Sequence, residues 1–169
     1  MADSFAIFVV VFVPMLIEAR RAVRNERAQR ARGGIEPGDD VYAAMRIAYP
    51  VGFLLMIAEG AARNGSPPPV FVFGAVVFVL AKALKWWAIA TLGRAWTFRV
   101  VVVPGDPLVA RGPYRLMRHP NYAAVVGELA GAALMTGAFV AGAVATAGFA
   151  VLLRKRIAVE ERMLSSHRR

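Results

Sequence analysis

The sequence predicts an all-α integral membrane protein with about five transmembrane helices. Of its 169 residues, 58% are hydrophobic and the mean hydropathy is +0.52, which is too apolar for an ordinary soluble domain. The apolar residues form long runs, and the basic residues, which give a formal net charge of +10, lie between those runs. Charges in these positions flank a bilayer, whereas nucleic-acid binding requires basic residues gathered on one face. We therefore predict a single membrane domain over residues 1–169, with membrane lipids and no nucleic acid among its partners.

The N-terminal part, residues 1–92, contains three apolar runs that we interpret as spans. The run at 5–17 is short for a helix that needs about 20 residues to cross a bilayer, whereas 47–62 and 70–92 come closer to that length. Between the first two runs we expect an exposed basic loop at 18–46, on the cytoplasmic side. Three prolines within residues 64–69 predict a turn between the second and third runs, because they cannot continue a helix.

The last apolar stretch, residues 122–153, would form a helix of roughly 48 Å, which exceeds a hydrocarbon core of about 30 Å. It is nevertheless short for two full passes. Glycine, alanine and threonine gather at its middle, in residues 136–142. This pattern favours a tight hairpin of two helices, with one long tilted helix as the alternative.

The distribution of basic residues decides between the hairpin and the long helix. They concentrate in 20–46, 94–118 and 154–169, whereas the turn near 64–69 carries only Arg63. If positive segments stay in the cytoplasm, the chain crosses an even number of times after residue 122, which requires the hairpin. We predict five spans in a bacterial inner membrane, with the N-terminus outside and the C-terminus in the cytoplasm.

A polar block, GPYRLMRHPNY at residues 112–122, interrupts this apolar chain. Its two prolines disfavour a continuous helix and leave a loop. Because the hairpin returns the chain to the same side, this loop and the C-terminal segment must lie close together. Between them they hold His119, Glu160 and Glu161. Cations, carboxylates and aromatic rings in one place suit a zwitterionic ligand.

Other chemistries fit these residues less well. An ion pair with Arg156, one helical turn earlier, is the alternative explanation for Glu160. We predict no metal site, because one histidine and two adjacent carboxylates that point about 100° apart on a helix are a poor ligand set. The absence of cysteine excludes thiolate ligands and a cysteine nucleophile. No glycine-framed serine and no phosphate-binding glycine loop is present.

The polar block, followed beyond the hairpin by RIAVEERML at 156–164, resembles the C-terminal half of the isoprenylcysteine carboxyl methyltransferase superfamily. These membrane enzymes include phospholipid methyltransferases and use S-adenosyl-L-methionine. Their hallmark is a Gly-Pro-Tyr and Arg-His-Pro-x-Tyr block with a distal Glu-Glu pair, and both parts occur here in order. The resemblance implies a methyltransferase that releases S-adenosyl-L-homocysteine, with residues 93–169 as its catalytic half. The cofactor-binding residues that it implies are Gly112, Pro113, Tyr114, Arg118, His119, Pro120, Tyr122, Glu160 and Glu161.

The preceding LKWWAIATLGRAWTFRVVVVPG, residues 84–105, resembles a bacterial subgroup that O-methylates long-chain alkylresorcinols and alkylpyrones. In that subgroup an Asn-Thr pair precedes the basic residue, whereas Thr97 and Phe98 precede Arg99 here. We expect a lipophilic small-molecule acceptor whose chain lies in the bilayer. Carboxyl methylation of a prenylcysteine-like substrate and N-methylation of a phospholipid are the alternatives. A non-enzymatic membrane scaffold or small transporter is a further alternative, although no internal repeat is visible.

Two residues are candidates for catalysis. Glu128 lies about two turns into the fourth span, where an ionisable group costs about 2.5 kcal/mol or more unless it is paired or functional. It is a candidate base for a phenolic acceptor, and an ion pair with Lys85 or Arg99 explains it equally well. Arg99 is a candidate to stabilise an acceptor oxyanion, with contact to lipid phosphate as the alternative. Lys82 and Lys85 themselves suit either such pairing or snorkelling to the interface.

Overall fold

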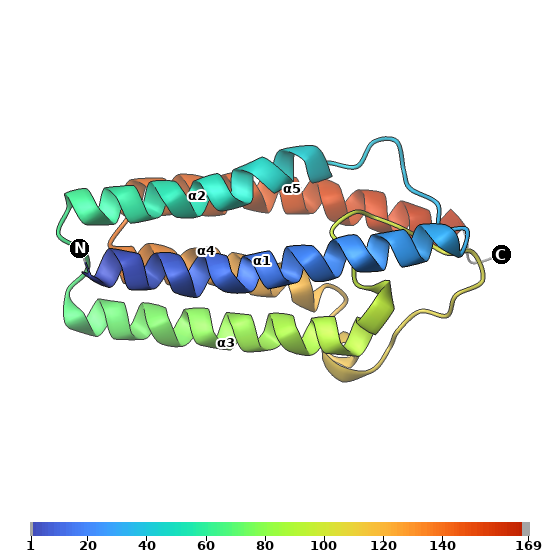
Figure 1. Cartoon of the computed structure of the whole chain (residues 1–169), viewed down its shortest axis with the longest axis horizontal. Coiled ribbons are helices and arrows are strands. Elements are labelled where there is room, and N and C mark those ends of the chain that lie inside the picture. Colours follow the sequence, from blue (N-terminus) through green and yellow to red (C-terminus); the bar gives the residue numbers. More distant parts are fainter. Residues whose placement is uncertain (1, 167–169) are drawn as a thin grey trace.

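The computed structural model describes residues 2–166 as a long bundle of α-helices (Figure 1). The last three residues of the basic tail, 167–169, lie outside the described residues. Within the described range the only β pairing is an isolated bridge between Ile35 and Val102, so the expectation of an all-α protein is confirmed. The elements are α1 (Ala2–Ala31), α2 (Tyr42–Ala62), α3 (Pro68–Leu92), η1 (Gly93–Ala95), η2 (Gly112–Arg115), α4 (Pro120–Thr136) and α5 (Phe139–Ser166).

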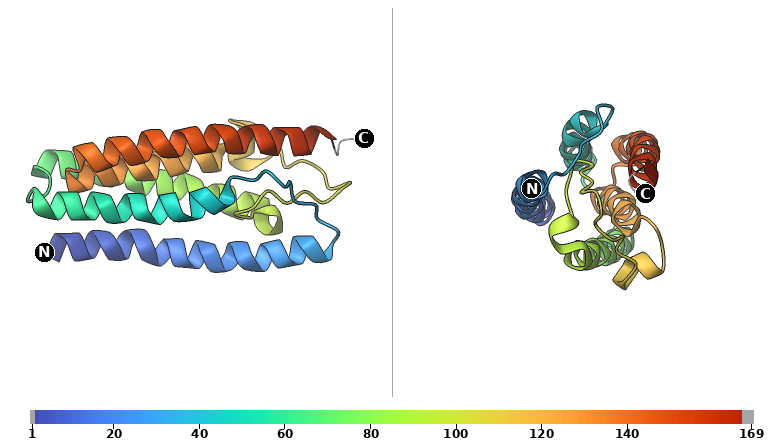
Figure 2. Two further views of the ribbon diagram at one scale, coloured as in Figure 1. Left: turned by 90° about the horizontal axis from the view of Figure 1, so that it is seen from above. Right: turned by 90° about the vertical axis from the view of Figure 1, so that its right-hand side faces the viewer.

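The two ends of the bundle differ in what they carry. One end holds the start of α1 and the short α2–α3 and α4–α5 connections (Figures 1 and 2). The other holds the long segments 32–41 and 93–119 together with the C-terminal end of α5. The basic segments expected on one side of the membrane therefore share one end of the molecule, which we call the loop end.

The predicted exposed loop at 18–46 is wrong in its extent, because α1 continues to Ala31 and α2 begins at Tyr42. No helix-breaking residue occurs between residues 18 and 31, and the chain first leaves the helix near Gly33, whose φ is +83°. The helix is also stabilised by burial. Glu18, Ala22, Asn25 and Gln29 recur at the three- and four-residue spacing of one helix face and are all buried. The true loop is limited to residues 32–41.

The hairpin between α4 and α5 is confirmed. Gly137 ends α4 in the left-handed conformation, at φ +70°, which an L-residue with a side chain rarely adopts. A Cβ atom added there would lie 2.9 Å from the carbonyl oxygen of Gly65, so this turn packs tightly on the α2–α3 turn. The hydroxyl of Ser66 donates to the carbonyl of Leu134 at 2.5 Å. These contacts close the end of the bundle opposite the loop end.

Close packing of α3 on α4 relies on glycine. A Cβ atom at Gly74 would meet the backbone nitrogen of Met135 at 2.7 Å, and one at Gly131 would meet that of Phe78 at 2.7 Å. Small residues at helix contacts are typical of membrane proteins, where van der Waals packing drives association. The main apolar core lies beside this contact and joins α1, α2, α3, α4 and α5; its largest fully buried apolar side chains are Phe53, Met56 and Leu129.

Two helical segments within residues 2–166 are long and apolar enough to cross a membrane, Tyr42–Ala62 and Pro68–Ala95. Large apolar side chains also cover much of the outer surface of the bundle, which suits contact with lipid. Examples are Leu54, Leu55, Phe73, Leu80 and Val144. The fold is thus that of a helical membrane protein, while the number of five spans and their direction remain predictions.

Candidate functional site

Three residues of the polar block shape the loop itself. Gly112 has a φ of +56°, and a Cβ atom there would lie 2.5 Å from Oγ1 of Thr91, so the loop rests directly on α3. Pro113 and Pro120 are fully buried, and Pro120 is the first residue of α4, where its missing N–H is not needed. Gly112, Pro113 and Pro120 do not line the cavity described below, and their predicted contact with a cofactor stays a prediction.

The loop closes on the C-terminal half of α5, as the sequence predicted. His119 Nε2 lies 3.3 Å from Oε1 of Glu161, and Arg118 Nη1 lies 3.2 Å from the same oxygen. The hydroxyl of Tyr122 donates to Oε2 of Glu160 at 2.5 Å, and the imidazole of His119 stacks on the Tyr122 ring at a centroid distance of 5.4 Å. We call these five residues the outer cluster. It brings a guanidinium, an imidazole, two carboxylates and a phenol ring to one place.

Tyr114 adds a neutral hydrogen-bonding group next to the outer cluster. Burial raises the pKa of its phenol above the usual value, and the nearby carboxylate of Glu160 raises it further. Tyr114 therefore keeps its proton at physiological pH. It can both donate and accept a hydrogen bond.

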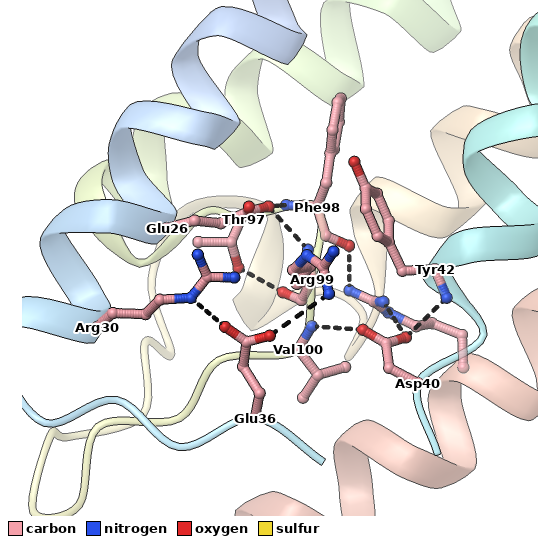
Figure 3. A network of polar contacts seen from close by, with 10 residues as sticks. Glu26, Arg30, Glu36, Asp40, Tyr42, Thr97, Phe98, Arg99 and Val100 are labelled. Atoms are coloured by element: carbon pink, nitrogen blue, oxygen red, sulfur yellow. Dashed lines mark hydrogen bonds and ion pairs between the residues drawn. The ribbon is translucent and has the colours of Figure 1, made fainter. Parts of the chain in front are cut away.

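Arg156 joins three parts of the loop end and is almost fully buried. Its Nη1 lies 2.5 Å from Oδ1 of Asp40, its Nη2 donates to the carbonyl of Phe98 at 2.5 Å, and its Nε donates to the hydroxyl of Tyr122 at 3.3 Å. The expected alternative, an ion pair between Arg156 and Glu160, is thus replaced by longer-range contacts. Asp40 also accepts from the backbone N–H of Val100 at 3.0 Å (Figure 3).

The polar face of α1 holds the segment that follows α3. Oε1 of Glu26 accepts the backbone N–H groups of Phe98 and Arg99, each at 3.1 Å (Figure 3). The side-chain amide of Asn25 donates to the carbonyl oxygens of Gly93 at 3.0 Å and Trp96 at 2.7 Å. Because the side chains of Asn25 and Glu26 are themselves buried, these hydrogen bonds fix the segment to α1.

Arg99 faces the same loop end. Its Nη1 lies 3.5 Å from Oε2 of Glu36, and its guanidinium lies over the Tyr42 ring at 4.8 Å from the centroid. Glu36 also pairs with Arg30, and the hydrogen bond from Arg30 lowers the pKa of the Glu36 carboxyl below its usual value. Glu36 and Tyr42 thus restrain the guanidinium of Arg99 (Figure 3), and Arg99 also lines the cavity described below.

A second charged cluster lies deeper in the bundle, and we call it the inner cluster. Nζ of Lys82 lies 3.0 Å from Glu128 and 3.2 Å from Glu18; Nζ of Lys85 lies 3.2 Å from Glu128 and 2.7 Å from Glu18. The hydroxyl of Tyr49 donates to Glu128. The ion pair between Glu128 and Lys85 is therefore confirmed, and Arg99 takes no part in it. Lys85 is 2% exposed, so it does not snorkel.

One cavity of about 650 Å³ connects the two clusters, within the range of roughly 300–1,000 Å³ that holds small ligands. Its wall includes Glu18, Tyr49 and Lys85 of the inner cluster, whereas Glu128 and Lys82 do not line it. The rest of the wall combines many apolar side chains with polar ones such as Arg46, Asn121 and Arg156. The sequence-predicted residues that line the cavity are Arg99, Tyr114, Arg118, His119, Tyr122, Glu160 and Glu161.

Sequence reasoning missed the contribution of α1 and α2 to this site. The signal in α1 was the arrangement of its arginines. Arginine occurs at 20, 21, 24, 27 and 30 but never at 18, 22, 25 or 29, which form one helix face. No comparable pattern marks Tyr49 or Asp40, because each meets its partner only after helices distant in sequence have packed together.

A His-Pro loop closed on a Glu-Glu helix beside a cavity is the arrangement that the sequence resemblance to membrane methyltransferases implies. The sequence model of the isoprenylcysteine carboxyl methyltransferase (ICMT) family matches residues 74–166, more than half of the chain. The protein YpbQ of Bacillus subtilis (strain 168), described as uncharacterized, is 33% identical over 158 residues, which cover 94% of each chain. An uncharacterized protein of Haemophilus influenzae (strain KW20) is 26% identical over 145 residues, covering 85% of this chain and 84% of that protein. The chain belongs to the ICMT family.

Proposed function

We propose that the protein transfers a methyl group from S-adenosyl-L-methionine to an oxygen of a lipophilic acceptor at the membrane. The observation that supports this most directly is the outer cluster, because it lies on a cavity that continues into the apolar bundle. We infer a long-chain phenolic or pyrone lipid as the acceptor. The resemblance of residues 84–105 to alkylresorcinol and alkylpyrone O-methyltransferases supports that class.

The outer cluster fits the chemistry of the cofactor. Carboxylates such as Glu160 and Glu161 suit an ammonium group or ribose hydroxyls, Arg118 suits a carboxylate, and the rings of His119 and Tyr122 suit a purine. When bound, S-adenosyl-L-methionine supplies an electrophilic methyl group and leaves as S-adenosyl-L-homocysteine. The residues themselves bind and orient, which is the main contribution that an enzyme makes to an in-line displacement.

The cavity beyond the outer cluster suits an amphiphile. Its wall there includes Met15, Met45, Val125, Phe149 and Leu153, all apolar. Such a wall accommodates an apolar chain or ring system and excludes water from the reacting atoms. Arg99, at the edge of the cavity, is placed to attract an anionic head group as it arrives.

We further propose that the loop end faces the cytoplasm of a bacterial inner membrane, with five spans and the N-terminus outside. The positive-inside rule supports this direction, because the basic segments share the loop end of the bundle. Measuring the accessibility of single cysteines, introduced at Ser66 and Gly38, to a membrane-impermeant reagent in intact cells tests it. Labelling of residue 66 but not of residue 38 is the expected result.

Incubation of the purified protein with radiolabelled S-adenosyl-L-methionine and a panel of acceptors tests the proposed reaction. The panel contains an alkylresorcinol, an alkylpyrone, a prenylcysteine and phosphatidylethanolamine. We expect label on the phenolic or pyrone lipid. Label on the prenylcysteine or on the amine lipid alone would establish the corresponding alternative. No label on any of them, together with no binding of S-adenosyl-L-homocysteine, would support a scaffold or transporter instead.

A further inference from the structure

We propose that Glu18 and Lys85 form the binding site for the acceptor hydroxyl, in which Glu18 takes the proton and Lys85 holds the oxygen. This inference rests on the proposed function and adds to it the site at which the acceptor is recognised. Glu18 was not predicted as a site residue, and Lys85 was predicted only as a partner for Glu128 or as a side chain that snorkels to the interface.

The two side chains are held at the inner end of the cavity by different helices. Glu18 comes from the middle of α1, and Lys85 lies two turns from the end of α3; their charged groups are 2.7 Å apart. Both line the cavity, although they are only 1% and 2% exposed. Tyr49 of α2 lies beside them, with the ammonium of Lys85 over its ring at 5.2 Å from the centroid.

The stability of the fold alone gives little reason to place charged side chains in the inner cluster. The carboxylates of Glu18 and Glu128 and the ammonium of Lys85 are buried in the inner cluster. Well-packed apolar residues in place of such a cluster are often neutral or stabilising. In a membrane bundle, buried ionisable groups mark functional positions by default. Here, moreover, one ion pair of the cluster, Glu18 with Lys85, lines a cavity whose wall also includes apolar side chains such as Met15 and Met45. A polar group of a bound molecule would meet this pair.

The pair is complementary to a hydroxyl group. A carboxylate only accepts hydrogen bonds and an ammonium only donates them, whereas a hydroxyl does both. The ammonium of Lys85 has three N–H donors and contacts two carboxylates, Glu18 and Glu128, so a donor remains for an acceptor oxygen.

The proton and electrons balance in this arrangement. The hydroxyl proton moves to a carboxylate oxygen of Glu18, and the ammonium of Lys85 stabilises the resulting oxyanion. An electron pair on that oxygen forms the new bond to the methyl carbon while the carbon–sulfur bond of the sulfonium breaks. The electrons of that bond stay on sulfur, which leaves as the neutral thioether of S-adenosyl-L-homocysteine. Glu18 then returns its proton to water through the cavity.

Glu128 has a different place in the same cluster. It does not line the cavity, and it receives contacts from Tyr49, Lys82 and Lys85. A carboxylate that already accepts three donors positions them more readily than it takes up a proton. We therefore assign to Glu128 the role of a positioning residue that fixes the Lys85 ammonium and the Tyr49 hydroxyl.

Binding of an alkylresorcinol and of its dimethyl ether to the purified protein, without cofactor, tests the proposal. We expect the wild type to bind the phenol about tenfold or more tightly than the ether, since a hydrogen bond to a charged group contributes about 1.5–3 kcal/mol. Lys85→Gln and Glu18→Gln should abolish this preference. Lys82→Gln is the matched control, because it removes the same charge from the same two carboxylates outside the cavity. It should keep the preference.

Two results would overturn the proposal: equal affinities of the wild type for phenol and ether, or an equal loss of preference in Lys82→Gln and Lys85→Gln. If a variant fails to fold, a photoreactive group on the ring of the alkylresorcinol provides a test on the wild type. Crosslinks within residues 15–23 or 82–89 support the site, and crosslinks confined to 112–122 contradict it. Binding of S-adenosyl-L-homocysteine is measured separately, so that a failure of the proposed function is distinguished from a failure of this site.

Discussion

One cavity reaches both the outer and the inner cluster, but the two clusters are built in opposite ways. The outer cluster is partly open to solvent, with the side chains of Arg118 and Glu161 82% and 41% exposed, and it comes from two short segments of sequence. The inner cluster has three buried members, Glu18, Lys85 and Glu128, and takes its residues from α1, α2, α3 and α4. An open cluster can exchange a water-soluble ligand, whereas a buried one is fixed in advance by packing. The difference suggests that the cofactor binds at the outer cluster and the lipophilic acceptor at the inner one.

The largest expected effect comes from the residue that ties the outer cluster to the rest of the loop end. Arg156→Leu leaves the buried carboxylate of Asp40 without its ion-pair partner. Breaking a buried pair in this way costs about 3–5 kcal/mol, so we expect a large fall in the thermal midpoint in detergent. Arg154→Leu removes an exposed arginine two residues earlier and is the control. Equal midpoints for the two variants would show that the buried pair is not a tether.

A smaller effect is expected at the inner cluster from Glu128→Gln. If Glu128 positions Lys85 and Tyr49, the rate of methyl transfer should fall by less than about tenfold, while removal of a general base costs roughly 10²–10⁴. Glu18→Gln should show the larger loss. Rates of methyl transfer measured across a range of pH for both variants decide which carboxylate takes the proton. A larger loss of rate in Glu128→Gln than in Glu18→Gln would make Glu128 the proton acceptor.

Removing the contact between Glu26 of α1 and the segment 97–100 should loosen only that segment. Glu26→Gln weakens two charge-assisted hydrogen bonds to the backbone N–H groups of Phe98 and Arg99. We expect faster hydrogen exchange in residues 97–100 and a loss of about 1–3 kcal/mol in stability. Arg27→Gln alters an exposed neighbour on the same helix and should leave exchange unchanged. Unchanged exchange in both variants would mean that α1 does not hold this segment.

The smallest effect is expected from Glu36, whose partners are partly exposed. Its pKa is lower in the folded protein than in the unfolded chain, so the carboxylate stabilises the fold above the unfolded pKa of about 4.3. That contribution is lost as the pH falls through this value towards the folded pKa. Denaturation of wild type and Glu36→Gln should therefore differ slightly at pH 7 and converge below about pH 4. A difference that grows at low pH would contradict the assignment.

The parts of the molecule that were predictable from sequence depend on local signals. Prolines at 67–69 cannot continue a preceding helix and instead begin α3, and the glycine at 137 ends α4, so the turn and the hairpin could be placed. The outer cluster was also predictable, because its residues form a contiguous block and a Glu-Glu pair whose meeting follows from the hairpin. The extent of α1 was not predictable from sequence, because its many arginines suggested an exposed segment. Its arginine-free face becomes buried only when it packs against η1 and the segment 96–100.

The inner cluster was beyond sequence reasoning for a related reason. Glu128 stood out as a charge within an apolar run, and Lys85 was a plausible partner. Glu18 looked like the first residue of a basic loop, and Tyr49 like an ordinary aromatic side chain of a span. Their meeting depends on the rotation of four helices about their axes, which the apolar periodicity of a lipid-facing bundle does not specify.

Calorimetric titration of the purified protein with S-adenosyl-L-homocysteine tests the central claim most directly. The wild type should bind it, and Glu161→Ala, which removes the carboxylate that contacts Arg118 and His119, should bind it about tenfold or more weakly. Arg162→Ala, whose side chain pairs with Asp39 and does not line the cavity, should bind like the wild type. No binding by the wild type, or equal binding by all three proteins, would contradict the assignment of the outer cluster as the cofactor site.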